Sequence, residues 1–213
     1  MGKYKKGILG PFRGKVGTTV GSSWNGIFYL KSLPDFGDYV PSTAQLNVQA
    51  KMAFVTGFLK PLKPLLNIGY KLFNKGITPM NKATSYHLKN AVTGSSTLNY
   101  AIDYTKVMIS EGNLPVADDP EVNVTVANQL NFSWVDDSDP ESTNDTDMLT
   151  VLAINPTKGN YTKKVNAVPR SAQAYVLPVP GYSGDEVQVY LFFVSADGKQ
   201  VSDSVYVGEF IVL

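Results

Sequence analysis

Cysteine is absent from this 213-residue sequence, and histidine occurs once, at His87. Disulfides, thiolate metal sites and cysteine nucleophiles are therefore excluded, and so is any site built from two imidazoles. A Ser-His-Asp hydrolase of the common type needs a Gly-x-Ser-x-Gly elbow, which the sequence lacks. No second metal ligand stands four residues from His87, so we expect this histidine to be packed or on the surface. These absences predict a protein that is not an enzyme and holds no cofactor.

Long apolar runs are also absent, because no window reaches eighteen consecutive apolar residues. We therefore expect no membrane span. The basic N-terminal residues are not followed by an apolar stretch, so the sequence shows no recognisable signal peptide. This pattern predicts a cytoplasmic or virion location, with extracellular release as an alternative.

The net charge of +1 hides an asymmetry between the two halves of the chain. Residues 1–116 have fourteen basic and four acidic side chains, a net charge of +10, whereas residues 117–213 have five basic and fourteen acidic ones, a net charge of −9. Complementary charge can steer copies of a protein together. Nucleic-acid binding by the basic half and mere solubility are the alternatives. Nucleic acid is the less favoured partner, because a nucleic-acid binder has no need for the complement of its own basic region.

Residues 1–40 are predicted to form a basic, glycine-rich extended arm. Eight glycines lie in this segment, and the seven up to Gly26 recur every three to five residues, which is too often for a helix. Residues 16–20 and 27–30 favour strands. Glycine-interrupted strands become stable when another backbone approaches closely. We expect the arm to dock on a neighbouring subunit, the alternative being an edge hairpin folded onto its own domain. The predicted interface comprises Lys3, Lys5, Lys6, Arg13 and Lys15 for charge complementarity, with Val16, Val20, Trp24, Phe28 and Leu30 as the docking strand.

Residues 41–116 are predicted to form a helical segment with a return strand. Ser42 and Gln45 have the spacing of a capping box, and apolar residues then recur every four positions. Pro61 and Pro64 are expected to end this first helix, and a second apolar run follows to Gly76.

A third helix is predicted to begin at Thr78-Pro79, with Pro79 as its first residue, and to close at Gly94. Alternating apolar residues within 98–116 then predict a bulged strand that pairs with the glycine-rich segment.

Residues 117–213 are predicted to form an immunoglobulin-like β-sandwich, because about seven short apolar runs alternate there with turn residues. The stretch 129–136, with Trp134 facing inward, and the stretch 186–195, with Tyr190, resemble the second and sixth strands of a fibronectin type III or immunoglobulin-like domain. That resemblance implies adhesive or structural work. The fold class expected for the whole chain is α+β or mainly β.

An acidic loop at Asp136–Asp147 is the best candidate for a metal site. Calcium takes six to eight oxygen ligands, and carboxylates two residues apart can converge on one ion. The EF-hand spacing fails here, because the loop has no glycine at its sixth position and no glutamate at its twelfth. A solvated loop is therefore the favoured interpretation, and calcium is the weaker alternative.

The whole chain resembles a family from Bacteroidota genomes that is known only as a domain of unknown function. That resemblance implies an architecture and a bacterial or phage origin, but no activity. The motifs that carry it are Gly10-Pro11-Phe12-x-Gly14-Lys15-Val16-Gly17, Gly21-Ser22-Ser23-Trp24, Asn90-Ala91-x-x-Gly94, Phe132-Ser133-Trp134 and Ser204-Val205-Tyr206-x-Gly208.

These observations favour a structural protein whose partner is a copy of itself. The arm would add as a β-strand to the sandwich of the next subunit, and the head-to-tail contact would build a filament, tail or shell. A glycan- or surface-binding module and a single-stranded nucleic-acid binder are the alternatives.

Overall fold

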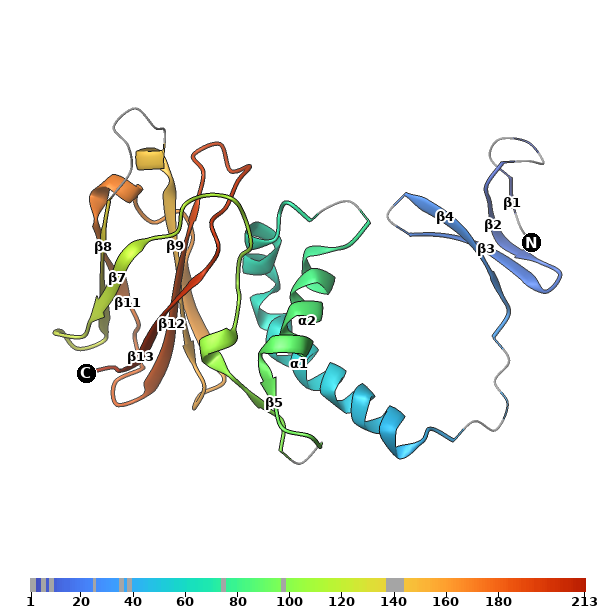
Figure 1. Ribbon diagram of the computed structural model, residues 1–213, viewed down its shortest axis with the longest axis horizontal. Helices are drawn as coiled ribbons and strands as arrows, with labels where there is room; N and C mark the ends of the chain where they lie inside the picture. Colours follow the sequence, from blue (N-terminus) through green and yellow to red (C-terminus); the bar gives the residue numbers. More distant parts are fainter. Residues whose placement is uncertain are drawn as a thin grey trace.

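The computed structural model describes residues 3–4, 7, 10–24, 26–34, 37, 40–73, 76–96, 99–136 and 144–213. Figure 1 shows a small N-terminal sheet, a pair of helices and a two-layered β-structure, in that order along the chain. The chain is thus mostly β with two helices, in agreement with the expected class.

The N-terminal sheet is an antiparallel meander with strand order β1-β2-β3-β4. Tight turns join its strands where glycines adopt positive φ, at Gly17 (φ 59) and Gly26 (φ 81). These conformations are accessible to glycine without the clash that a Cβ introduces. The strands are β1 (Lys3–Tyr4), β2 (Phe12–Val16), β3 (Thr19–Trp24) and β4 (Ile27–Ser32).

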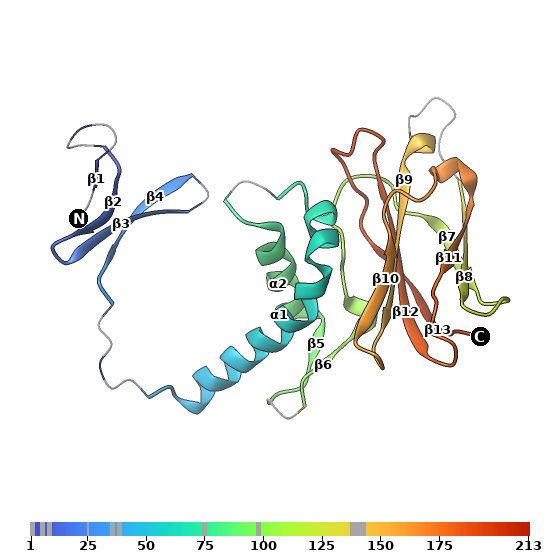
Figure 2. The same ribbon diagram turned by 180° about the vertical axis from the view of Figure 1, so that it is seen from behind.

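The first helix, α1 (Thr43–Gly69), begins with the predicted capping box. The Ser42 hydroxyl accepts from the Gln45 backbone N–H, and the Gln45 side-chain oxygen accepts from the Ser42 backbone N–H. The prediction that Pro61 and Pro64 end this helix is wrong, because both lie inside it. Leucines around and beyond the prolines are fully or almost fully buried, and this packing outweighs the roughly 3 kcal/mol that an internal proline costs. Figure 2 shows the helix axis changing direction along its length, as prolines induce.

The second helix, α2 (Pro79–Asn90), has the predicted proline at its first turn, but it ends at Asn90 rather than near Gly94. Gly94 instead has φ +92, at the start of the turn between β5 (Val92–Thr93) and β6 (Ala101–Ile102). The predicted return strand is therefore only two residues long. It pairs with β5 and not with the glycine-rich segment, and the 3-10 turn η1 (Tyr104–Lys106) follows it. Within the described part of the chain, neither helix is long and apolar enough to cross a membrane.

The C-terminal part is a β-sandwich of two antiparallel sheets, with strand orders β10-β9-β12-β13 and β11-β8-β7. The predicted second and sixth strands are β8 and β12, whereas β10 was not expected from the sequence. The strands are β7 (Asp118–Asn123), β8 (Gln129–Val135), β9 (Met148–Asn155), β10 (Asn160–Lys164), β11 (Ala174–Pro178), β12 (Glu186–Val194) and β13 (Val205–Ile211). Short 3-10 turns stand before β9 (η2, Asn144–Thr146) and before β11 (η3, Arg170–Ala172).

The central strands β9 and β12 are buried on both faces. Alternate residues of β12 project to opposite sides, so Leu191 and Phe193 pack against the three-stranded sheet while Tyr190 and Phe192 pack against the helices. The helices thus form a third layer over the sandwich, as Figure 1 shows. The boundary predicted at residue 117 separates elements that share one hydrophobic core.

Candidate self-association surface

The N-terminal sheet has two chemically different faces. Residues directly opposite each other in neighbouring strands share a face, and successive residues alternate between faces. The observed register aligns Gly14 with Gly21 and Leu30, and Lys15 with Val20 and Lys31. We call one side the apolar face, defined by Phe12, Val16, Phe28 and Leu30. The other side is the basic face, which carries all the described basic residues of the sheet and is defined by Lys3, Arg13, Lys15, Val20, Trp24, Ile27, Tyr29 and Lys31.

Both faces of this sheet are exposed. Every residue of β4 is exposed, with Phe28 at 55% and Leu30 at 64% of their maximal accessible surface. The Phe12 ring lies over Gly21, where any Cβ would collide with it. Among the described residues, the two hydrophobic cores contain none from β1 to β4. A small sheet without a buried face is only marginally stable in water, and an exposed apolar face of this kind is typical of an interaction surface.

Strand β4 is also an edge, because it ends the strand order of its sheet. One side of an edge strand has backbone N–H and C=O groups that are free to pair with another strand. Figures 1 and 2 show this sheet standing apart from the helices and the sandwich.

The predicted interface residues are divided between the two faces. Lys3, Arg13 and Lys15 lie on the basic face with Val20 and Trp24. The other three apolar residues, at positions 16, 28 and 30, lie on the apolar face. The predicted single docking strand is wrong, since the glycine turns divide these residues among β2, β3 and β4. Lys5 and Lys6 lie outside the described residues.

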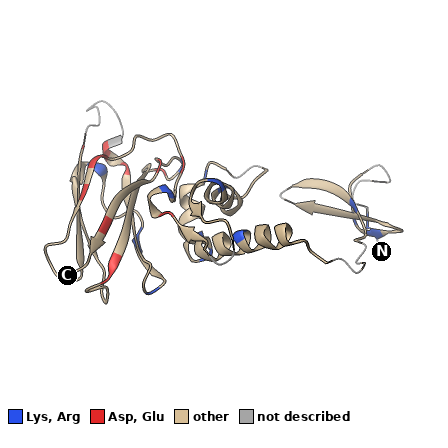
Figure 3. Ribbon diagram, turned by 60° about the horizontal axis from the view of Figure 1, so that its bottom comes forward, with Lys and Arg blue, Asp and Glu red and all other residues tan. Residues whose placement is uncertain are grey.

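Figure 3 shows that most of the acidic residues lie in the sandwich, whereas the charged residues of the N-terminal sheet are basic. Within the basic half of the chain, residues 1–40 contribute +4 and the helical segment 41–116 contributes +6. The N-terminal segment and the sandwich thus have net charges of opposite sign.

The candidate calcium loop falls largely outside the described residues, which omit positions 137–143. Across the described residues, no three metal-binding side chains cluster, and the calcium alternative stays a prediction. Asp147, at the end of that loop, is buried and lies 3.9 Å from the Arg170 guanidinium. Burial raises the pKa of Asp147, and the charge of Arg170 opposes that rise.

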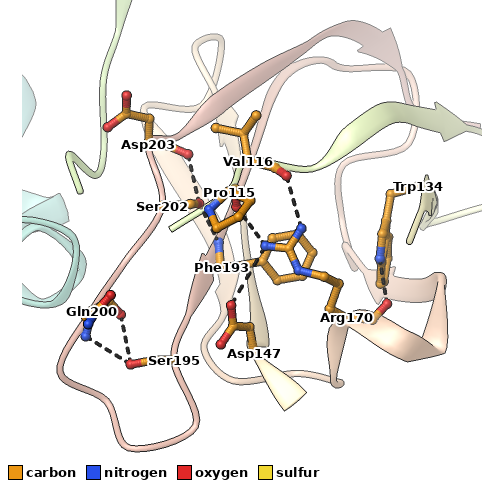
Figure 4. Close-up of polar contacts among 10 residues, drawn as sticks. All are labelled: Pro115, Val116, Trp134, Asp147, Arg170, Phe193, Ser195, Gln200, Ser202 and Asp203. Carbon is orange, nitrogen blue, oxygen red and sulfur yellow. Dashed lines mark hydrogen bonds and ion pairs between the residues drawn. The ribbon is translucent and has the colours of Figure 1, made fainter. Parts of the chain in front are cut away.

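Sequence reasoning did not single out Arg170, a charged residue that is fully buried in the sandwich. Its guanidinium donates to the carbonyls of Pro115 and Val116 at 2.7 and 3.0 Å and stacks 3.9 Å from the centre of the Phe193 ring. Its own carbonyl accepts from Trp134 Nε1 at 2.8 Å. Figure 4 shows Arg170 joining the segment before β7 to the sandwich, which is a structural role.

His87 is buried in α2, as the packed alternative predicted. Its Nδ1 donates to the Ala83 carbonyl at 2.7 Å, and its ring lies near those of Phe58 and Tyr86. No described residue provides a hydrogen-bond partner for Nε2. Burial lowers the pKa of His87, although the bond to Ala83 opposes that shift.

This burial predicts a loss of stability in mild acid. Below its ordinary pKa of about 6.5 the unfolded state binds a proton at His87 that the folded state does not, so stability falls as pH falls. We expect a slope of at most about 1.4 kcal/mol per pH unit between pH 6.5 and the lowered folded pKa. Denaturant unfolding of the wild type and His87→Phe from pH 7.5 to 5 measures it. The variant should lose this slope, and equal slopes would contradict the assignment.

The likeness to solved structures is limited to about half of the chain. A fibronectin type III domain of the human collagen alpha-1(XX) chain is 16% identical, with a TM-score of 0.35, and the match covers 48% of this chain and 88% of that one. A solved "Myokine structure" is 13% identical, with a TM-score of 0.35 and coverages of 47% and 98%. No curated protein matches the chain. The model of the "Family of unknown function (DUF6266)" matches residues 11–208, and the chain belongs to this family.

Proposed function

We propose that the protein is a non-enzymatic structural protein that self-assembles head to tail. The N-terminal sheet of one copy docks on the sandwich of the next, and repetition of this contact builds a filament, tail or shell. The observation that carries the proposal is a sheet exposed on both faces, with a free edge strand, whose charge is opposite to that of the sandwich.

The glycan-binding alternative has weaker support. A cavity of about 210 Å³ lies between α1 and the β9–β10 turn and contains aromatic residues. Two of its polar side chains are already engaged, because the Tyr161 hydroxyl donates to the Pro61 carbonyl and the Asn155 amide donates to Asp185. Few groups therefore remain to orient a sugar.

Nucleic-acid binding keeps one favourable observation. The basic face places Trp24 and Tyr29 on the same side as Arg13 and Lys15, and aromatic and basic residues together suit single strands. Retention of an oligonucleotide with a steep loss of affinity in salt would favour this alternative.

Self-assembly can be tested by comparing the same kind of substitution at two exposed apolar residues, one within the N-terminal sheet and one outside it. Leu30→Asp should abolish assembly, because it places a carboxylate on the apolar face without touching either core. Val40→Asp, the same kind of change at a residue that is 84% exposed and outside the sheet, should leave assembly intact. Sedimentation velocity over a concentration series measures both. A wild type that stays monomeric at every concentration would overturn the proposal.

A further inference from the structure

Strand β4 offers only alternate residues to a further strand, because successive residues of a strand direct their backbone groups to opposite sides. The Leu33 amide donates to the Thr18 carbonyl at 3.0 Å, and the register then directs the backbone groups of Lys31 toward β3. The groups of Phe28 and Leu30 therefore point to the free edge. These two side chains lie on the apolar face, so an antiparallel partner must place apolar residues directly opposite them.

Three of the four edge strands of the sandwich do not meet this requirement or lack the charge to attract a basic sheet. Strand β10 carries Lys163 and Lys164, which would repel it, and β11 carries no charge. On β13 the Val212 amide donates to the Asp185 carbonyl at 3.0 Å, so the register directs the backbone groups of Glu209 to the free edge. Antiparallel pairing there would place a carboxylate beside the apolar face.

Strand β7, the fourth edge, has the required backbone pattern. In the neighbouring β8, the Trp134 amide donates to the Gln173 carbonyl at 3.2 Å, on the side of β11. The next residue, Ser133, therefore directs its backbone groups toward β7, where Glu121 lies opposite it. The backbone groups of Glu121 are thus directed at β8, and those of Val122 point to the free edge.

The side chains of β7 complement the two faces of the N-terminal sheet. Val122 is buried in the sandwich core, and Val124 is partly buried against the same core. Glu121 and Asn123 alternate with them and are exposed on the outer side of the three-stranded sheet. An antiparallel partner whose free backbone belongs to its apolar residues therefore continues the core with its apolar face and meets Glu121 with its basic face.

Strand β7 is also the most acidic of the four edges. It contains Asp118, Asp119 and Glu121, all exposed, whereas β13 contains one acidic residue and the other two edges contain none. The one charged residue of β4 is Lys31. Charge complementarity thus selects the same edge as the backbone pattern does.

We propose that β4 of one copy pairs antiparallel with β7 of the next, with Leu30 opposite Val122 and Lys31 opposite Glu121. Cross-strand pairs of apolar residues and of opposite charges each stabilise a sheet. A shift by two residues, the smallest that the backbone pattern allows, would separate Lys31 from Glu121. Pro120 has no N–H to donate, so the ladder ends next to Glu121. The inference rests on the proposed self-assembly and names its acceptor.

Disulfide trapping tests this register, and the absence of cysteine from the chain makes it free of background. Full-length Lys31→Cys is mixed with full-length Glu121→Cys under mild oxidation. These residues would form a pair without mutual backbone hydrogen bonds, whose Cα atoms are about 4.5 Å apart and within disulfide reach. We expect a covalent dimer containing one copy of each variant. Lys31→Cys mixed with Glu209→Cys, an exposed acidic position on the β13 edge, is the matched control and should form at least tenfold less dimer.

The outcomes separate the two proposals. An equal yield from the β13 control, or no mixed dimer while the wild type still assembles in sedimentation, would overturn the β7 acceptor and leave self-assembly standing. An internal disulfide in the Lys31→Cys/Glu121→Cys double variant, with mixed single variants unlinked, would show that the sheet folds onto its own body and would overturn the acceptor in a second copy. A wild type without any assembly would overturn self-assembly and this acceptor with it.

Charge exchange provides a second readout. Glu121→Lys and Lys31→Glu should each weaken assembly about two- to fivefold, because like charges directly opposite each other destabilise a sheet. The double variant restores opposite charges in exchanged positions and should recover most of the loss. Loss without recovery would contradict the pairing of these two residues.

Discussion

Arg170→Met is expected to lower the free energy of unfolding by about 3–5 kcal/mol, because breaking a buried ion pair leaves its partner uncompensated. Asp147 would remain buried beside an apolar side chain, and the carbonyls of Pro115 and Val116 would lose their donors. Chemical denaturation followed by tryptophan fluorescence measures the change, because Trp134 packs in the same cluster as Arg170.

The matched control is an ion pair at the surface. Lys158 lies 2.6 Å from Asp185, but its side chain is 44% exposed. Lys158→Met should therefore cost at most about 1 kcal/mol. If the two variants lost the same stability, the burial of Arg170 would not be the source of its effect.

Two glycines of α1 are expected to respond in opposite directions to alanine. Gly69 is buried against the segment that follows η1, and a Cβ there would collide with the Ile109 carbonyl and lie 2.7 Å from the Ser110 Cβ. Gly69→Ala should lower the free energy of unfolding by about 3 kcal/mol or more, because the helix end and this segment must separate.

Gly57→Ala is the internal control in the same helix. Apart from the adjoining backbone of the helix itself, no atom of the described residues lies within 4 Å of the Cβ that this change would introduce, so only helix propensity changes. We expect a gain of up to about 1 kcal/mol. Thermal unfolding of both variants measures the contrast, and a loss of stability in Gly57→Ala or none in Gly69→Ala would contradict the packing described here.

Local signals in the sequence predicted local structure well. The capping box at Ser42, the proline that opens α2 and the inward Trp134 follow from short-range rules, and the structure contains all three. The prediction that the two prolines end α1 was wrong because tertiary packing of the buried leucines outweighs the cost of a proline inside a helix. Such packing has no short-range signal in the sequence. The predicted return strand failed for a different reason, because a local turn that begins at Gly94 pairs it with β5 and not with the glycine-rich segment.

The candidate surface was only partly predictable. Composition indicated the basic, glycine-rich segment, but the sorting of its residues between two faces depends on turns at Gly17 and Gly26 that set the register. One feature of the sequence does indicate a buried role for Arg170. It is one of two arginines among nineteen basic residues, and arginine is favoured over lysine where a planar, multiply bonded cation is buried.

Strands β9 and β12 are buried on both faces, and this burial couples the unfolding of the helices to that of the sandwich. The helices and the three-stranded sheet pack on opposite sides of β9 and β12. Neither layer can unfold without exposing the apolar side chains of these two strands, on which the other layer also packs. Residues 43–211 should therefore behave as one cooperative unit, with coincident calorimetric and van't Hoff enthalpies. The N-terminal sheet shares none of those strands, so its loss should leave that transition unchanged.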